Sequence, residues 1–524
     1  MSLLRDALRR YGMKKAPEDV IAESRDPNKS LKKSLGALDL VVLGVGAIIG
    51  AGIFVLVGLG AQTAGPNIVW AFVLAGFICA LAGLAYAELA STIPTSGSAY
   101  AYAYSALGET MAWVLGWALV LEYAVGSAAV AIGWSSNFVG LLGSFGVELP
   151  VYLTASPEMF SGVPGGFVNL PAVFIVALIT TLLVVGSKLT ARFASVFVVA
   201  KVAILMLVIG LGFFFVKAAN FALPSPAPDP NEWYAILGSV GPIVGAAAVI
   251  FFAYIGFDAV STTAEETKNP KRDLPIGILG SLAICTLLYI LASAVLVGMV
   301  PYTDFIAGGE VTAREAQERL GEPFGYAFEA NGLLWAANLI RAGAILGITS
   351  VLMVLLMGGP RVFFALARDG LLPQSWSKVH DKYGTPYRTT IGTGIGVALV
   401  AGFGTLGIAG QLTNIGTAFA FGLVCLAVVV LRYAKPDLQR PFRVPLNIGR
   451  FPILAALGAL LCFGLMMSTG RFTIIAFFAW MGLGLMAYAA YGIRKSKLFG
   501  QLGRSGAAPL REVDADVTLE EVKG

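Results

Sequence analysis

The chain has 524 residues with a formal net charge of +5; 57% of its residues are apolar and only 13% are charged. Soluble proteins carry roughly 25% charged residues, and surface-to-volume scaling prevents a soluble domain from burying this much apolar surface. Twelve membrane spans of ~20 residues need about 240 apolar positions. The composition therefore predicts an all-α polytopic membrane protein and excludes collagen, a coiled coil and a secreted disulfide scaffold.

Residue usage also narrows the possible chemistry. The four cysteines lie in apolar runs without CxxC spacing, and the single histidine, His380, lies in a polar loop, so we expect no metal site and no cofactor. No HExxH, GxSxG or GxxxxGK[ST] motif is present, which disfavours a membrane enzyme and a primary pump. The small net charge indicates no nucleic-acid partner.

Hydropathy predicts twelve spans. In chain order they cover residues 39–64, 67–92, 111–140, 170–187, 193–216, 239–263, 274–300, 332–359, 389–408, 411–431, 451–469 and 473–493. Residues 1–35 form a basic N-terminal segment, interpreted either as an interfacial amphipathic helix or as a basic topogenic tail. Residues 496–524 form a polar tail that we expect to be disordered.

The distribution of basic residues predicts the orientation. With a cytoplasmic N-terminus, 30 of the 36 Lys and Arg residues fall in the N-terminal segment, the even-numbered loops and the C-terminal tail. Five fall on the opposite side, and Lys201 lies within a span. This is a strong positive-inside bias, so both termini are predicted to be cytoplasmic and the number of spans to be even.

The first span, LGVGAIIGAGIFVLVG, is rich in glycine between Gly46 and Gly52. Glycine tolerates backbone angles that a β-carbon forbids, so the helix can be interrupted here. The pattern Gly46-xxx-Gly50 is also typical of close helix packing in membranes, and the glycines alone favour packing. A dinucleotide-binding loop is excluded because no βαβ unit surrounds the glycines.

The sixth span, VIFFAYIGFDAVSTTAEE, combines an aromatic cluster with Gly256 and Asp258. Spans 1 and 6 occupy the same place in two successive five-span units of opposite orientation, and paired interruptions at such positions indicate a transporter's midplane site. An interrupted helix exposes N–H groups at one half-helix start and carbonyls at the other half-helix end. These groups attract an anion and a cation respectively, so the predicted ligand is an amino acid.

Three of the ionisable residues within spans are candidates for a role in function. Lys201 lies about nine residues, roughly 13 Å, from the cytoplasmic end of span 5, where a lysine costs roughly 2.5–3.5 kcal/mol to insert. It is either a structural or snorkelled side chain or, as we favour, a lysine that loses its proton during a cycle. Glu122 is a proton-sharing carboxylate, a partner for a cationic substrate or a protonated structural residue. Asp258 is interpreted as a gating or structural anchor.

Several segments together resemble the amino acid–polyamine–organocation (APC) superfamily, and within it the cationic amino acid transporter-like permeases. They cover most of residues 36–436 in the order GVGAIIGAGIFVLVG, YAELASTIPTSGSAYAYAYSALGE, LEYAVGSAAVAIGWS, FFAYIGFDAVSTTAEETKNPKRDLPIGI and GITSVLMVLLMGGPRVFFALARDGLLP. The resemblance implies a five-plus-five inverted-repeat fold, with helices 1–5 in residues 36–217, helices 6–10 in 218–431 and two further helices in 432–495. It also implies alternating access through movement of unwound helices 1 and 6.

The resemblance assigns expected roles to individual residues. The substrate carboxylate is expected to meet the backbone of Ile49, Gly50, Ala51 and Gly52. The ammonium is expected to meet the carbonyls of Phe252, Ala253 and Ile255, with Phe252 as an aromatic lid. Lys201 matches a helix-5 lysine that replaces a bound cation in proton-coupled relatives, with Thr349 and Ser350 as expected neighbours.

The resemblance predicts a proton-coupled amino acid permease in the plasma (inner cell) membrane, whose partners are an amino acid, protons and membrane lipids. An amino acid or polyamine exchanger and a non-transporting sensor remain alternatives. One departure is Ala51, where other members carry a hydroxyl residue. The bulky Leu355, Leu356 and Met357 favour a broad or neutral amino acid range, whereas Glu122 favours cationic substrates. No sequence feature bears on oligomeric state.

Overall fold

The computed structural model describes residues 33–95, 98–185, 190–228, 230, 232–308, 311–380, 383 and 385–496, without the side chains of residues 190–196 and 494. Most of the two terminal segments considered above lies outside these residues. The described chain is almost entirely helical, and one short antiparallel hairpin pairs β1 (Asn447–Ile448) with β2 (Phe451–Pro452). This agrees with the predicted all-α class.

In the first half of the chain, the described residues form ten α-helices. They are α3 (Ala37–Ile48), α4 (Val57–Ala64), α5 (Ile68–Thr92), α6 (Ser98–Ala106), α7 (Glu109–Ser144), α8 (Val151–Thr154), α9 (Glu158–Ser161), α10 (Leu170–Val185), α11 (Thr190–Gly212) and α12 (Ala218–Phe221). Shorter π or 3₁₀ turns join them at η1 (Gly52–Leu56), η2 (Gly65–Asn67) and η3 (Phe213–Phe215).

The second half is built in a similar way. Its α-helices are α13 (Gly241–Ile250), α14 (Pro270–Met299), α15 (Ala313–Gly321), α16 (Pro323–Ala330), α17 (Leu334–Arg368), α18 (Tyr387–Phe403), α19 (Leu406–Ala434), α20 (Ile453–Met467), α21 (Arg471–Ala487) and α22 (Ile493–Lys495). The π or 3₁₀ turns are η4 (Trp233–Val240), η5 (Phe251–Tyr254), η6 (Phe257–Glu266), η7 (Tyr302–Phe305), η8 (Gln374–Ser377) and η9 (Tyr488–Gly492).

Eight helical stretches among the described residues are long and apolar enough to cross a membrane. One of them, Ala37–Thr92, contains two of the predicted spans. The shorter apolar helices α10 and α20 coincide with two more, and α18, of 17 residues, lies in the predicted span 389–408. The protein is a multi-pass integral membrane protein, as its composition predicted.

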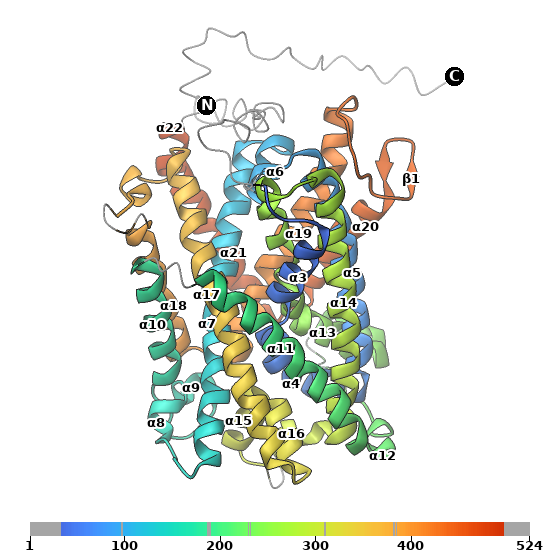
Figure 1. Cartoon of the computed structure of the whole chain (residues 1–524), viewed down its shortest axis with the longest axis vertical. Coiled ribbons are helices and arrows are strands. Elements are labelled where there is room, and N and C mark those ends of the chain that lie inside the picture. The colour runs from blue at the N-terminus through green and yellow to red at the C-terminus, as the bar shows by residue number, and fades with distance from the viewer. Residues whose placement is uncertain are drawn as a thin grey trace.

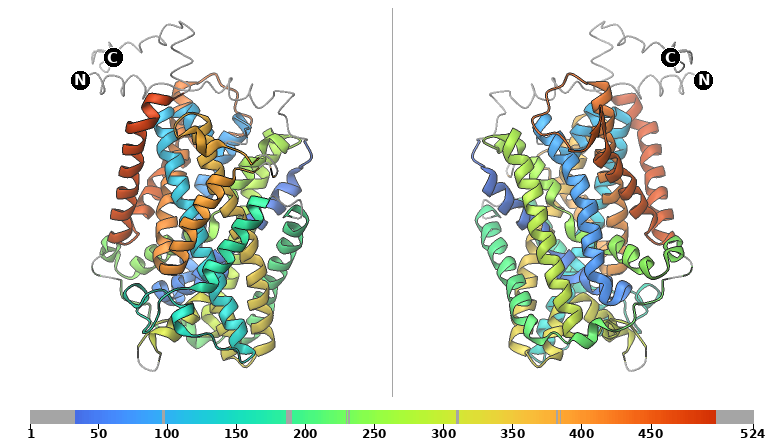
Figure 2. Two further views of the ribbon diagram at one scale, coloured as in Figure 1. Left: turned by 90° about the vertical axis from the view of Figure 1, so that its left-hand side faces the viewer. Right: turned by 90° about the vertical axis from the view of Figure 1, so that its right-hand side faces the viewer.

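The long helices run side by side between two distinct ends (Figure 1). At one end lie α6, the β1–β2 hairpin and α22, and at the other lie α8, α9, α12, α15 and α16. The first group belongs to segments predicted to be cytoplasmic and the second to segments predicted to face outward. Figure 2 shows α20 and α21 on the outside of the bundle.

Three helices of the first half of the chain pack against helices of the second half: α5 contacts α14, α7 contacts α17, and α10 contacts α18. The interrupted helices also meet, through η1 and η5. Hereafter α3, η1 and α4 together are called helix 1, and α13, η5 and η6 together are called helix 6. These two helices form part of the buried core around which the other pairs are arranged.

Two buried ion pairs fasten peripheral segments to the bundle. At the end that holds α6, Glu88 of α5 pairs with Arg432 of α19 at 2.5 Å and also accepts the Val444 N–H at 2.8 Å. At the other end, Arg341 of α17 donates to Glu322, which lies between α15 and α16, at 2.6 Å. A buried charge is tolerated only when it is paired, and removing one partner is strongly destabilising.

We therefore expect Arg432→Ala to destabilise the protein by roughly 3–5 kcal/mol. The substitution leaves the buried Glu88 with only Arg440, at 3.5 Å, as a basic partner among the described residues. The midpoint of thermal unfolding of the purified protein measures the effect. Arg450→Ala is the control, because Arg450 is exposed in the turn between β1 and β2. Equal midpoints for the two variants would show that the ion pair contributes nothing to stability.

Candidate functional site

Helix 1 is interrupted where its sequence predicted. Its inner half, α3, ends at Ile48, and Ile49 adopts an extended conformation with φ −69° and ψ 110°. The chain re-enters helical geometry at Ala51 and continues as the π-turn η1 and then α4. The Ile49 N–H still donates to Val45 O at 3.0 Å, and the ladder resumes with Phe54 N–H to Gly50 O at 3.2 Å. The break is therefore confined to a few peptide groups.

Helix 6 is interrupted at the corresponding place. The 3₁₀ turn η5 ends in Ile255, with an extended ψ of 134°, and Gly256 follows with φ 120°. Only glycine adopts this backbone conformation without strain. The second half of the helix then continues as η6, whose start is stabilised by Asp258: its Oδ1 accepts the Gly256 N–H at 3.1 Å.

The two breaks are in direct contact. A β-carbon at Gly52 would collide with the backbone of Ala253 in η5, and one at Gly256 would lie 2.7 Å from Ala47 O in α3. Each break thus packs against the half-helix that precedes the other break. The close glycine packing and the interruption, which the sequence presented as competing interpretations, both occur here.

The breaks leave polar backbone groups unsatisfied. The N–H groups of Gly50, Ala51 and Gly52 have no backbone partner among the described residues, and the carbonyls of Ala253 and Ile255 accept no backbone N–H from them. Orphan groups of this kind create a positive end on η1 and a negative end on η5. The Phe252 carbonyl differs, because it already accepts the Ile255 N–H at 3.1 Å.

Lys201 of α11 lies against the negative end of α3. Its Nζ donates to Gly46 O, a carbonyl released by the break in helix 1, and to Ser350 Oγ of α17 at 3.2 Å. The side chain is 1% exposed, and Gly347 leaves room for its stem, since a β-carbon there would lie 3.1 Å from Lys201 Cβ. The lysine thus joins helix 1 to α17.

The two hydroxyl residues expected beside Lys201 have different hydrogen-bond partners. Ser350 contacts the lysine, whereas the Thr349 hydroxyl donates to Ile345 O at 2.6 Å and accepts the indole N–H of Trp134 at 3.0 Å. Thr349 therefore joins α17 to α7. The sequence could not distinguish these orientations because the two residues are adjacent.

Tyr289 of α14 was not identified from the sequence. Its hydroxyl donates to the carbonyl oxygen of Ile48, the last residue of α3, at 2.9 Å. Tyr289 is itself fully buried. Two donors from different helices, Lys201 and Tyr289, therefore occupy carbonyls at the end of α3. The only signal for Tyr289 in the sequence is a polar tip within an apolar span.

Two of the buried carboxylates, Asp258 and Glu122, have different surroundings. Asp258 is bonded to the backbone of the break in helix 6. Glu122 of α7 is 1% exposed, and neither of its oxygens has a hydrogen-bond partner among the described residues. Glu122 lies beside Gly416 of α19.

Both breaks are closed off from both ends of the molecule. Ile49, Ala51 and Ala253 are at most 2% exposed, while Phe252 and Ile255 are 5% and 9% exposed. On one side α15 and α16 cover η1. On the other side α6 packs against η6, and Ser98 hydrogen-bonds Ser261 at 2.7 Å.

The chain matches the family model described as amino acid permease over residues 35–488. It is 43% identical to the branched-chain amino acid permease of Bacillus subtilis over 93% of this chain and 98% of that protein. It is 42% identical to the methylthioribose transporter of the same organism, with the same coverage. It is 38% identical to the vacuolar cationic amino acid transporter 4 of Arabidopsis thaliana, over 81% of this chain and 67% of that protein.

Replacing Gly52 with alanine tests the contact between the breaks. We expect Gly52→Ala to destabilise the protein by about 1–3 kcal/mol, because the new methyl group overlaps the backbone of Ala253 and the two half-helices must separate. Thermal unfolding measures the loss. Gly464→Ala on α20 is the matched control, since nothing lies within 4 Å of a β-carbon there. Identical unfolding midpoints would argue against tight packing of the breaks.

Proposed function

Because the chain belongs to the amino acid permease family, we propose that it is a secondary transporter that moves amino acids across the membrane by proton symport. Its family and relatives are transporters rather than enzymes. The observation that carries the proposal is the pair of contacting breaks, which present unpaired N–H groups on helix 1 and unpaired carbonyls on helix 6.

We propose twelve membrane crossings with both termini cytoplasmic, arranged as two inverted repeats of five helices in residues 36–217 and 218–431 and two further helices in 432–495. The contacts of α5 with α14, α7 with α17 and α10 with α18 support this arrangement. They are the contacts that a two-fold relation between the repeats predicts, and the central helices 1 and 6 meet in the same way.

An amino acid fits the charges that the breaks expose. Its carboxylate is proposed to bind the N–H groups of Gly50, Ala51 and Gly52, and its ammonium the carbonyls of Ala253 and Ile255. Each helix end contributes ~0.3–2 kcal/mol. The backbone from Ile49 to Gly52 forms the floor of this site, and the Phe252 ring is proposed to cover it.

Proton coupling is proposed to act through Lys201. The charged ammonium neutralises the negative end of α3 and links Gly46 to Ser350 on α17. A neutral amine loses most of its attraction to the helix end, so deprotonation would release α3. The extended Ile49 and positive-φ Gly256 lie where helices 1 and 6 would bend during alternating access.

The range of substrates is set by the groups around this backbone site. Relatives of similar identity are named for branched-chain amino acids and for methylthioribose, so a neutral thiosugar is a second candidate. It lacks the charged head that the breaks favour, and we therefore propose a broad or neutral amino acid range. Exchange without net proton uptake is the alternative mode.

Replacing Lys201 tests the coupling. We expect Lys201→Ala to lower uptake driven by a pH gradient about tenfold or more, because a charge-assisted hydrogen bond is worth ~1.5–3 kcal/mol, and to remove its pH dependence. Uptake into proteoliposomes with and without an imposed pH gradient is the measurement. Lys217→Ala, at an exposed lysine after α11, is the control.

Wild-type uptake that ignores the gradient would refute symport and favour exchange, and a Lys201→Ala variant with normal pH dependence would refute the role of the lysine. Ser350→Ala and Thr349→Val refine the test. Because only Ser350 contacts the lysine, its loss is expected to change the pH dependence more than loss of the Thr349 hydroxyl.

Replacing Glu122 tests substrate range. If Glu122 pairs with a cationic side chain, Glu122→Gln will weaken competition by lysine about tenfold or more, and competition by alanine less than about twofold. The measurement is inhibition of one labelled substrate by the twenty amino acids and methylthioribose. Equal losses for lysine and alanine would assign Glu122 a structural or protonic role, and inhibition by methylthioribose alone would overturn the amino acid proposal.

A further inference from the structure

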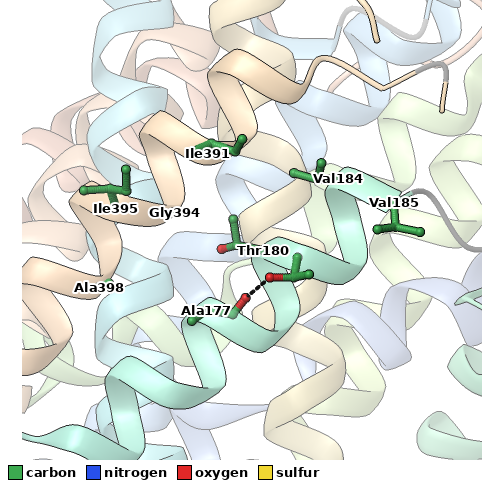
Figure 3. A pocket seen from close by; sticks show the side chains of 9 residues that line it. Ala177, Thr180, Val184, Val185, Ile391, Gly394, Ile395 and Ala398 are labelled. Carbon is green, nitrogen blue, oxygen red and sulfur yellow. Dashed lines mark hydrogen bonds between the residues drawn. The ribbon is translucent and has the colours of Figure 1, made fainter. Parts of the chain in front are cut away.

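A groove lies at the periphery of the bundle, away from the breaks. An apolar groove of about 390 Å³ separates α10 from α18, the helix pair on the left of Figure 1. Figure 3 shows side chains from the two helices facing each other across it. The residues that line it include Ala177, Thr181, Val184, Ile391, Gly394 and Ile395.

The shape of the groove follows from residue size. A β-carbon at Gly394 would lie 2.5 Å from the Thr180 side chain, so the two helices approach most closely there, while Ala177 and Ala398 leave space nearby. Ile391 and Ile395 are 42% and 59% exposed. In a membrane protein these exposed apolar side chains face lipid, and the natural occupant of the groove is an acyl chain.

An acyl chain alone gives little selectivity, because lipid tails are as apolar as the groove itself. Polar groups must therefore distinguish one lipid from another. Thr180 of α10 lines the groove and points toward α18 (Figure 3); its hydroxyl is buried near Gly394 and has no hydrogen-bond partner among the described residues. The neighbouring Thr181 hydroxyl, in contrast, donates to Ala177 O at 2.8 Å. An unpaired hydroxyl is unfavourable in apolar surroundings.

Arg388 is the basic residue nearest in sequence to the part of α18 that lines the groove. It precedes Ile391 by one helical turn, and the spacing of 388, 391, 395 and 398 places all four residues on one face of α18. The Thr385 hydroxyl donates to Val184 O at 2.7 Å, which fixes the start of α18 beside the end of α10. Arg388 is exposed, and its Nε donates to the Tyr387 hydroxyl at 3.0 Å. This end of the bundle is the one predicted to be cytoplasmic.

We propose that the groove between α10 and α18 is a binding site for one anionic glycerophospholipid, with an acyl chain against Gly394 and the phosphate on Arg388. A guanidinium binds phosphate oxygens through two parallel N–H donors. Basic sites between transmembrane helices on the cytoplasmic side are known to select anionic headgroups. This site is separate from the breaks and does not depend on the transport proposal.

The test is retention of lipid by the purified full-length chain. After incubation with mixed micelles of equal phosphatidylglycerol and phosphatidylcholine, native mass spectrometry counts the lipids that remain bound. We expect one phosphatidylglycerol per chain, preferred over phosphatidylcholine about fivefold or more. Arg388→Gln should remove the preference, and Ala177→Leu, which fills the groove from an exposed position, should lower retention of both lipids.

Two matched variants serve as controls. Arg450→Gln removes an exposed arginine from another loop, and Ala203→Leu enlarges an exposed alanine on α11, so both should retain lipid as the parent chain does. Thermal unfolding without added lipid verifies that all four variants fold. The four substitutions lie outside the breaks and the Lys201 contacts, so failure of the lipid site leaves the transport proposal untouched.

Three outcomes would overturn the proposal. Equal retention of the two lipids by the parent chain would indicate ordinary annular lipid. Retention that neither Arg388→Gln nor Ala177→Leu changes would place the bound lipid elsewhere. Dimers of the parent chain that Ala177→Leu separates would assign the groove to a second copy of the chain.

Discussion

Within a lipid bilayer, every backbone N–H and carbonyl must find a partner inside the protein, and the interrupted helices 1 and 6 are where this constraint is hardest to meet. The protein supplies partners for part of the exposed backbone: Lys201 for Gly46, Tyr289 for Ile48 and Asp258 for Gly256. The remaining groups are the N–H groups of Gly50 to Gly52 and the carbonyls of helix 6. In the proposed function, these unpaired groups are the ones that bind the two charges of the substrate.

These three partners differ in whether their hydrogen bonds depend on a charge that can be removed. Tyr289 is a neutral donor and Asp258 is held by the backbone of its own turn, so both are suited to keep the half-helices in shape. Lys201 alone combines a removable charge with contacts to two different helices. In the proposed cycle, the lysine is therefore the contact whose strength responds to protons, while the tyrosine maintains the end of α3.

The surrounding helices explain how the two breaks are buried. Small residues allow helix 1 to approach helix 6 until backbone meets backbone, and this close packing makes the pair a rigid unit on each side of its breaks. Different segments cover the two breaks: the α15–α16 segment packs against helix 1, and α6 packs against helix 6. A buried ion pair between Arg341 and Glu322 holds the α15–α16 segment against α17. In the proposed cycle, movement of this segment away from α17 would break that ion pair.

The sequence by itself determined the membrane class, the places of the two breaks and the position of a buried lysine. These features follow from local properties: apolar run length, glycine conformational freedom and the rarity of a charge within a span. Only the tertiary structure decided which hydroxyl reaches Lys201, that Tyr289 caps α3, and that α10 and α18 enclose a groove beside Arg388. Each of these three features depends on which face of a helix packs against a helix that is distant in the sequence. Hydropathy does not specify this rotation when a helix is apolar on all sides.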